Sequence, residues 1–439
     1  MRGTFSAAAA LLVNGASALP SYSYSPHTKI EAPTPAAPYY VSLGPRPYYL
    51  INNMTEGPLK KKLQSCENGP FAISSWSIGH RGGSVLQFPE ETEEATFAGA
   101  RMGAGVLECD VAFTSDLGLV CRHSQCDLHT TTNILLRPEL ARKCTVPFTP
   151  ANRTSPANAL CCTSDITTAE YKSLCGKQDG FNASAVNVRD YQSGTAKWRT
   201  ELYDQCGTVQ TLDGYIKLVN ALPGYRNFTP ELKTPPAQVP MPFKGYTQEQ
   251  YARDLVNAFI KNGIDPSRVW LQSFLPADVF QWIKEFPVFG KQAVYLDEAG
   301  ETPATLVTAI ARLPSLKARG VNIVAPPIPY LLRAGGPNND TIVPAAYGLA
   351  AKAAGLDIIT WSFERSAPFA QIGASEYYYA PLVNLTNKFD GRLFEVIDVL
   401  AQQVGVVGLF SDWSAAVTYY ANCLNVQGPN SAKYQAIKA

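Results

Sequence analysis

The apolar run Val106-Leu107-Glu108-Cys109-Asp110-Val111-Ala112-Phe113 contains two carboxylates. A short run that is rich in branched residues is typical of a buried strand. Side chains two apart on a strand point to one face, so Glu108 and Asp110 should converge while Cys109 points the other way. Buried carboxylates require a compensating charge. Two oxygen ligands on a rigid strand suit Mg²⁺ or Ca²⁺, because zinc favours His or Cys donors.

Two histidines flank this strand, in a chain that has only four. His80 follows a predicted strand at 73–78, within Gly79-His80-Arg81-Gly82-Gly83, and His123 follows the extended segment 119–122. A neutral imidazole and an imidazolium can exchange roles near neutral pH, so such a pair can take one proton and give another. Taken singly, a histidine after a strand or a Gly-rich turn is a weak signal. Together they indicate an acid/base pair beside a cation site.

Short β-rich runs alternate with amphipathic helical patterns along the rest of the chain. Eight strands are predicted, at 73–78, 106–113, 227–232, 269–274, 293–296, 321–325, 357–362 and 406–410. Helices are predicted at 90–102, 248–261, 276–285, 302–313, 345–354 and 392–403. An eightfold alternation predicts a closed parallel barrel of the α/β class, the (βα)8 TIM barrel. Catalytic groups in such barrels lie at the carboxyl ends of the strands.

Two further side chains near predicted strand ends are candidates for lining the pocket. They are Gln272 and Trp361. The alternative for Gln272 is a hydrogen-bonding packing role, and the alternative for Trp361 is a place in the barrel core. The strand-end position alone does not separate these alternatives.

Several motifs follow one another in a fixed order. They are His80-Arg81-Gly82, Pro89-Glu90-Glu91-Thr92, Glu108-x-Asp110-Val111, Thr114, His123, Leu128-x-Thr130-Thr131 and later Pro230-Glu231-Leu232-Lys233. This series resembles the glycerophosphodiester phosphodiesterase family, in its secreted and fungal-like form. In the last motif, Glu231 and Lys233 share a strand face, as a third metal ligand and a phosphate-binding lysine would require.

The resemblance implies a role for each group. His80 and His123 would be the general acid and base, and Arg81 and Lys233 would bind the substrate phosphate. Glu108, Asp110 and Glu231 would hold one Mg²⁺ or Ca²⁺. The implied reaction is metal-dependent cleavage of a small-molecule glycerophosphodiester, such as glycerophosphocholine, to sn-glycerol 3-phosphate and an alcohol. The attacking group stays open between water and the substrate's own 2-hydroxyl, which would leave a cyclic phosphate.

Two other functions remain in competition with this one. Related barrels with two histidines act on sphingomyelin or lysophospholipids, so a phospholipase D-like activity is the enzymatic alternative. The alternative outside catalysis is a surface or wall glycoprotein that keeps the barrel without turnover. An exposed apolar rim would favour the lipid substrates, and binding without product would favour the glycoprotein.

The N-terminal region predicts secretion. Arg2, the apolar core 7–13 and small residues through Ala18 form a signal peptide pattern over 1–18, too short to span a bilayer. A Pro/Ser/Tyr-rich lead-in is predicted at 19–47. Six glycosylation sequons support an extracellular or cell-surface glycoprotein: Asn53, Asn152, Asn182, Asn227, Asn339 and Asn384. The chain ends without an apolar tail, so no lipid-anchor signal is expected there.

Ten cysteines fit an oxidising compartment. The barrel is predicted over 48–130 and 207–430, with a cysteine-rich cap inserted at 131–206, after the second strand. Five cysteines lie inside this cap and five outside, so full pairing requires an odd number of bridges between cap and barrel. The predicted pairs are Cys121–Cys126 and Cys66–Cys423. A buried free thiol is the alternative for Cys109.

Composition excludes some partners. The hydrophobic fraction of 46% and charged fraction of 17% are ordinary for a globular protein, and the net charge is +1. The densest basic block is only Lys60-Lys61-Lys62, so neither nucleic acid nor an anionic membrane is favoured. No transmembrane segment is predicted, and the oligomeric state stays open.

Overall fold

The computed structural model describes residues 41–200, 206–373, 376–386 and 389–428. The predicted signal peptide and most of the predicted lead-in lie outside the described residues. Ser42 already donates its backbone N–H to the carbonyl of Arg101 at 2.9 Å, and helix α1 (Arg46–Asn52) begins before Tyr48. The packed chain therefore starts a few residues ahead of the boundary drawn from sequence.

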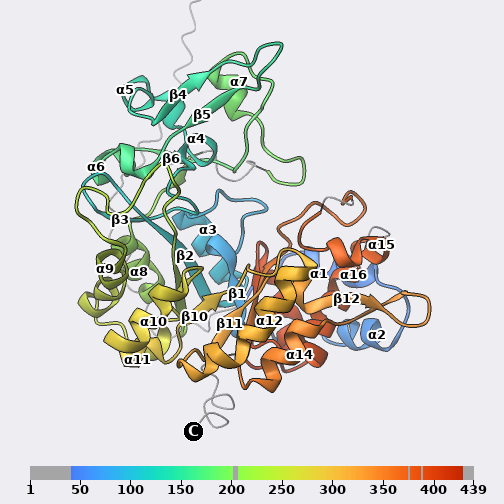
Figure 1. Cartoon of the computed structure of the whole chain (residues 1–439). Coiled ribbons are helices and arrows are strands. Elements are labelled where there is room, and N and C mark those ends of the chain that lie inside the picture. The colour runs from blue at the N-terminus through green and yellow to red at the C-terminus, as the bar shows by residue number, and fades with distance from the viewer. Residues whose placement is uncertain (1–40, 201–205, 374–375, 387–388, 429–439) are drawn as a thin grey trace, which may run out of the picture. The chain divides into compact units, whose positions relative to one another are not determined.

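Eight parallel strands close into a barrel, which confirms the predicted (βα)8 fold (Figure 1). They are β1 Ser74–Gly79, β2 Ala104–Phe113, β8 Asn227–Leu232, β9 Gln272–Ser273, β10 Val294–Leu296, β11 Ile323–Ala325, β14 Asp357–Phe363 and β15 Gly408–Ser411. Strand β1 pairs with both β2 and β15, and this double pairing closes the sheet. All eight predicted strands are present, although β9 is limited to two residues.

The register of the strands determines which side chains meet. Asp110 of β2 lies opposite Glu231 of β8, which in turn lies opposite Gln272 of β9. The extended segment predicted at 119–122 is β3 (Leu119–Cys121), which pairs antiparallel with the end of β2. Three candidate site residues thus form a row across adjacent strands, and β3 brings the chain before His123 back to the same end.

Helices follow most strands around the barrel. The longer ones are α3 Glu93–Arg101, α8 Leu212–Ala221, α9 Gln248–Lys261, α10 Pro276–Glu285, α12 Pro303–Ala318, α14 Ala346–Ala353, α16 Arg392–Asp398 and α17 Ser414–Cys423. Threonines begin several of them: the side chains of Thr92, Thr211, Thr247 and Thr302 accept a backbone N–H of the first turn. The helix predicted at 392–403 begins as α16 and continues as a π-helical segment over Val399–Val404.

The cysteine-rich insertion has its own small core. Leu128, Ile134, Tyr171 and Tyr191 are among the buried residues of that cluster. Short elements surround it: α4 Leu128–Thr131, β4 Val146–Thr149, β5 Asn158–Leu160, α6 Thr168–Tyr171, β6 Cys175–Gly176, α7 Val188–Gln192 and β7 Gly207–Thr208. These strands have two to four residues, too few to give a periodic signal in the sequence.

The ten cysteines form five disulfides: Cys66–Cys423, Cys109–Cys121, Cys126–Cys162, Cys144–Cys161 and Cys175–Cys206. The predicted Cys66–Cys423 bridge is confirmed. The predicted Cys121–Cys126 bridge is wrong, because the pairing of β3 with β2 places Cys121 against Cys109, which is therefore not a free thiol. One bridge, Cys126–Cys162, joins barrel to cap, which confirms the odd number.

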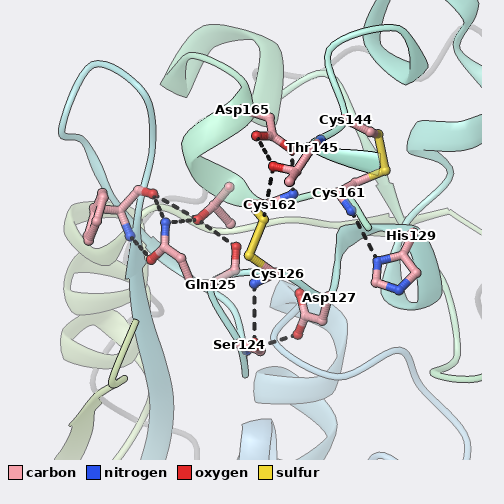
Figure 2. The surroundings of a disulfide bond; sticks show 12 residues. Ser124, Gln125, Cys126, Asp127, His129, Cys144, Thr145, Cys161, Cys162 and Asp165 are labelled. Atoms are coloured by element: carbon pink, nitrogen blue, oxygen red, sulfur yellow. Dashed lines mark hydrogen bonds between the residues drawn. A yellow bond between two sulfur atoms is a disulfide. The ribbon is translucent and has the colours of Figure 1, made fainter. Parts of the chain in front are cut away.

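Figure 2 shows how this single connection is reinforced. Cys161 and Cys162 are adjacent, and each bonds to a different segment, Cys144 and Cys126. The backbone N–H of Cys161 donates to Nδ1 of His129 at 3.3 Å (Figure 2). The cap is thus tied down a few residues after His123.

Two expectations about the surface can be checked on the described residues. Five sequon asparagines are exposed or half-buried, but Asn227 is buried inside β8, so a glycan there is incompatible with the barrel. Within the described ranges, no helix has both the length and the apolar character needed to cross a bilayer.

Candidate active site

A cavity of about 320 Å³ lies at the carboxyl ends of the barrel strands. Eight of the nine residues predicted for the site line it: His80, Arg81, Glu108, His123, Glu231, Lys233, Gln272 and Trp361. The ninth, Asp110, is buried and does not form part of the lining. A cavity of about 450 Å³ at the amino ends of β1, β2 and β8 has no charged side chain among the described residues that line it. The reactive groups therefore gather at the end that the barrel fold uses for chemistry.

Three carboxylates converge in this cavity. Glu108, Asp110 and Glu231 each place an oxygen within 4.8 Å of the other two. Burial, followed by the charge of Asp110, raises the pKa of Glu108 well above its ordinary value. Burial also raises the pKa of Glu231 to about 8, although Lys233, whose Nζ lies 2.5 Å from Glu231 Oε1, acts in the opposite direction. Both shifts reflect mainly the burial of these carboxylates, and the charge of the neighbouring Asp110 adds to it.

The residues present fit a divalent cation. Both oxygens of Asp110 are buried without a hydrogen-bond partner among the described residues, which costs free energy unless positive charge lies close by. Lys233 Nζ is 3.7 Å and Arg81 Nε is 3.6 Å from these oxygens, too far for hydrogen bonds. Three converging carboxylates are the oxygen donors that Mg²⁺ and Ca²⁺ prefer.

His80 is held by groups from three other strands. Its Nδ1 lies 2.5 Å from Oδ1 of Asp412, the residue directly after β15. Its Nε2 lies 3.3 Å from the hydroxyl of Ser362 on β14 and 3.8 Å from Glu108 Oε2 on β2. Burial lowers the pKa of His80, and the charge of Asp412 partly offsets this effect. Asp412 therefore fixes the ring with Nε2 on the side of the carboxylates.

Asp412 is in turn held by two arginines from distant parts of the chain. Arg199 of the cap places Nη2 2.8 Å from Asp412 Oδ2, and Arg365, which follows β14, places Nη1 3.2 Å from the same oxygen. Burial alone would raise the pKa of Asp412, but Arg365 and His80 outweigh it and hold the pKa below its ordinary value. Asp412 is therefore ionised, and a cap residue contacts the partner of His80.

His123 has different surroundings. It follows β3, and the preceding N–H, that of Arg122, donates to the Asp110 carbonyl at 2.6 Å. A ring nitrogen of His123 lies within 4.8 Å of carboxylate oxygens of Glu90 and Asp127. Burial and the positive charge of Arg81 are the main causes that hold the pKa of His123 well below its ordinary value. His123 is thus neutral near pH 7.

Arg81 is locked in place by two glutamates. Its backbone, at φ 50°, lies in the left-handed region, and its N–H donates to Glu108 Oε2 at 2.8 Å. Its Nη1 donates to both carboxylate oxygens of Glu90, at 2.9 and 3.0 Å. Its Nε is buried and has no hydrogen-bond partner among the described residues. The ion pair with Glu90 therefore fixes the Arg81 guanidinium at the cavity.

Gln272 and Trp361 both line the cavity. Gln272 donates Nε2–H to Glu108 Oε1 at 2.8 Å, which orients that carboxylate. Trp361 donates Nε1–H to the Ala325 carbonyl at 2.8 Å, which leaves its ring as part of the lining. Gln272 thus combines packing with contact to the site, and Trp361 belongs to the cavity and not to the barrel core alone.

Several residues of the site were not predicted from sequence. They are Asp412, Arg365, Arg199, Ser362, Phe274, Glu298, Tyr378 and Phe410. Asp412 lies two residues after the strand predicted at 406–410, so the strand-end rule could have found it. Arg199 and Tyr378 lie in irregular segments, where no periodic pattern marks a position.

The chain is similar to several known proteins. Residues 80–297 match the glycerophosphoryl diester phosphodiesterase family. An extracellular protein of Arthroderma benhamiae is 43% identical over 250 residues, which cover 56% of this chain and all of that protein. The glycerophosphodiester phosphodiesterase GDPD6 of Arabidopsis thaliana is 24% identical over 391 residues, which cover 85% of this chain and 91% of that protein.

Solved structures resemble the chain more distantly. A Silicibacter pomeroyi protein that bears the same family name aligns over 82% of this chain and 96% of its own. Its sequence identity is 17% and the TM-score is 0.49.

Proposed function

Because this chain belongs to the glycerophosphoryl diester phosphodiesterase family, and is thus a phosphoric diester hydrolase, we propose that it is secreted and cleaves small glycerophosphodiesters such as glycerophosphocholine. The products would be sn-glycerol 3-phosphate and the headgroup alcohol. The observation that carries the proposal is the cavity in which His80, His123 and the carboxylates Glu108 and Glu231 come together. Five disulfides and an extracellular relative support secretion.

Glu108, Asp110 and Glu231 would hold one Mg²⁺ or Ca²⁺. Such a cation, when bound, supplies positive charge to a nonbridging phosphate oxygen. Lys233 and Arg81 would bind the remaining charge of the phosphate group. Ion pairs with Glu231 and Glu90 hold the side chains of Lys233 and Arg81 at the cavity.

The two histidines would carry the proton transfers. The hydroxyl that attacks phosphorus, from water or from the glycerol 2-position, loses its proton to one imidazole as the new P–O bond forms. The other imidazole gives a proton to the departing headgroup oxygen as its P–O bond breaks. Each positioned transfer contributes roughly 10² to 10⁴-fold to the rate. Asp412 would keep Nδ1 of His80 protonated, so that Nε2 is the atom that exchanges protons.

The size of the cavity favours deacylated substrates. At about 320 Å³ it is at the small end of the range for ligand sites. A glycerophosphodiester fits such a volume better than a phospholipid with long acyl chains. The phospholipase D-like alternative therefore requires chains that stay outside, and lysophosphatidylcholine and sphingomyelin should be poorer substrates than glycerophosphocholine.

A single assay series tests the proposal. Protein secreted by a eukaryotic host is incubated with glycerophosphocholine, then with a chelator, and then with added Mg²⁺ or Ca²⁺. We expect release of sn-glycerol 3-phosphate and choline that stops on chelation and returns with one of the two metals. A phosphorus NMR time course separates attack by water from attack by the 2-hydroxyl, because only the latter produces a cyclic phosphate. Metal binding by calorimetry without any product would instead support the non-catalytic glycoprotein.

A further inference from the structure

The substrate cavity has a second, chemically different part. Phe274, Trp361 and Tyr378 contribute aromatic rings to its lining, and Glu298 adds a carboxylate outside the three that could bind metal. Glu298 follows Asp297 at the end of β10, away from β1, β2 and β8, which carry the phosphate-binding and metal-binding groups. We name Trp361, Tyr378 and Glu298 the aromatic wall.

Neighbouring aromatic rings in this part of the cavity are nearly perpendicular to one another. The ring of Phe274 is 5.7 Å from that of Trp361 at an interplanar angle of 85°. The ring of Trp361 is 6.1 Å from that of Tyr378 at 79°. Lys233 Nζ lies 5.8 Å from the centre of the Phe274 ring, so this ring already faces a cation at the phosphate end. Perpendicular neighbours present both ring faces and edges to the same space.

The charge of the aromatic wall is negative. Glu298 forms no salt bridge with any described residue, whereas Asp297 beside it pairs with Arg312 at 3.1 Å. Aromatic faces attract cations through their quadrupole, most strongly when the cation is weakly hydrated. A carboxylate near those faces adds to the attraction. A neutral polyol would gain neither effect and would place hydroxyls against rings that offer few hydrogen bonds.

We propose that the aromatic wall is a subsite for a cationic headgroup, and that the trimethylammonium group of choline fits it best. The inference rests on the proposed phosphodiesterase function and specifies its substrate class. Arg81 and Lys233 would repel a cationic headgroup from the phosphate end, so charge orients the substrate along the cavity. An alkyl chain would make favourable apolar contacts with the rings, but it would not be attracted by the charge of Glu298.

Specificity measurements test the proposal directly. We compare kcat/KM for the choline and ethanolamine diesters of glycerol phosphate with those for the glycerol and inositol diesters. The wild-type protein should prefer both cationic substrates. Tyr378→Leu should lower the choline-to-glycerol ratio of kcat/KM roughly five- to thirtyfold, the range of a cation–π contact. Glu298→Gln should lower the ratios for choline and ethanolamine about two- to fivefold, as expected for a partly exposed charge pair.

Neighbouring residues supply matched controls. Tyr377 is next to Tyr378 and 40% exposed, and Glu301 is a nearby carboxylate, but neither lines the cavity. Tyr377→Leu and Glu301→Gln should leave the specificity ratios unchanged. Two results would overturn the subsite and leave the phosphodiesterase function intact. One is a wild-type kcat/KM that is the same for cationic and neutral diesters, and the other is an equal effect of the Tyr377 and Tyr378 changes.

A binding measurement separates this inference from the function on which it rests. Saturation-transfer NMR with choline chloride should show saturable binding that Glu298→Gln and Tyr378→Leu weaken and the two controls do not. If no diester is cleaved but this pattern of binding is seen, the proposed function fails and the subsite stands. If diesters are cleaved and choline does not bind, the subsite fails alone.

Discussion

Oδ1 of Asp412 lies 2.5 Å from Nδ1 of His80, so two residues 332 positions apart in sequence form one unit at the site. Both are buried, and the contact leaves Nε2 of His80 beside Glu108. A carboxylate on one ring nitrogen sets the tautomer and orientation of a histidine and stabilises its protonated form. The proton transfer proposed for His80 would therefore depend on a residue that directly follows the last strand.

His80→Ala and His123→Ala should each abolish turnover without unfolding the protein. Each change removes one of the two proton-transfer groups, and each group is expected to contribute about 10² to 10⁴-fold to kcat. The measurement is kcat with glycerophosphocholine, with circular dichroism to confirm the fold. Near-normal activity in either folded variant would remove that histidine from the mechanism.

Asp412→Asn should lower kcat by about 10²-fold with little change in KM. The amide keeps the size of the side chain but no longer stabilises a positively charged imidazole on His80. If His80 protonates the leaving group, a glycerophosphodiester with a p-nitrophenyl leaving group should lose much less, because that anion leaves without a proton. Equal losses for the choline and nitrophenyl substrates would indicate that His80 acts as the base.

Arg199→Leu should reduce kcat roughly 10- to 100-fold, the usual effect of losing a partner that orients a catalytic group. Arg199 holds Asp412 at 2.8 Å from the cap, and its side chain is only 6% exposed. Lys197, two residues earlier and exposed, provides the control as Lys197→Leu. The nitrophenyl substrate should again be less affected than glycerophosphocholine, which a general loss of stability would not produce.

Divalent cation should stabilise the protein as well as activate it. A ligand at 100 times its dissociation constant adds about 2.7 kcal/mol to the free energy of unfolding, which raises Tm. Glu231→Gln removes one of the three converging carboxylates, so it should eliminate both the activity and most of the Tm rise with Mg²⁺ or Ca²⁺. Thermal scans with and without chelator check this, and an undiminished rise would place the cation elsewhere.

A fall in pH should lower the stability of the cap, because it protonates His129. Burial lowers the pKa of His129 to about 4, below its ordinary value of 6.5, and the neutral ring accepts the Cys161 N–H at Nδ1. A depressed folded-state pKa means that this stability is complete above pH 6.5 and is lost as the pH falls through 4. The loss is at most about 3 kcal/mol.

The comparison for His129 is unfolding by urea at pH 7 and at pH 4.5, in wild type and in His129→Gln. The variant cannot take up a proton at this position, so its free energy of unfolding should fall less between pH 7 and pH 4.5 than that of the wild type. An equal fall in both proteins would assign the acid sensitivity to other groups.

The barrel could be predicted from sequence because the hydrophobic period and the length of each strand or helix are local signals. Glu108 and Asp110 are two apart on one strand, and parallel closure brings Glu231 opposite Asp110 without further information. The partner of Cys121 depended on β3 folding back on β2, a long-range pairing that cysteine spacing does not reveal. Arg199 shows the same limit, because its contact with Asp412 follows from how an irregular cap is placed and not from any local pattern.

The adjacent Cys161 and Cys162 make the assembly of the site depend on the redox history of the chain. Their bridges to Cys144 and Cys126 must form in the correct pairing before the cap is fixed next to His123. The Cys109–Cys121 bridge links β2 to β3, the strand that leads to His123. We expect protein made in a reducing cytosol to lack a formed cap and therefore turnover. Synthesis in an oxidising host is thus a requirement for preparing it, and under the proposed secretion the protein would gain activity only after it leaves the reducing cytosol.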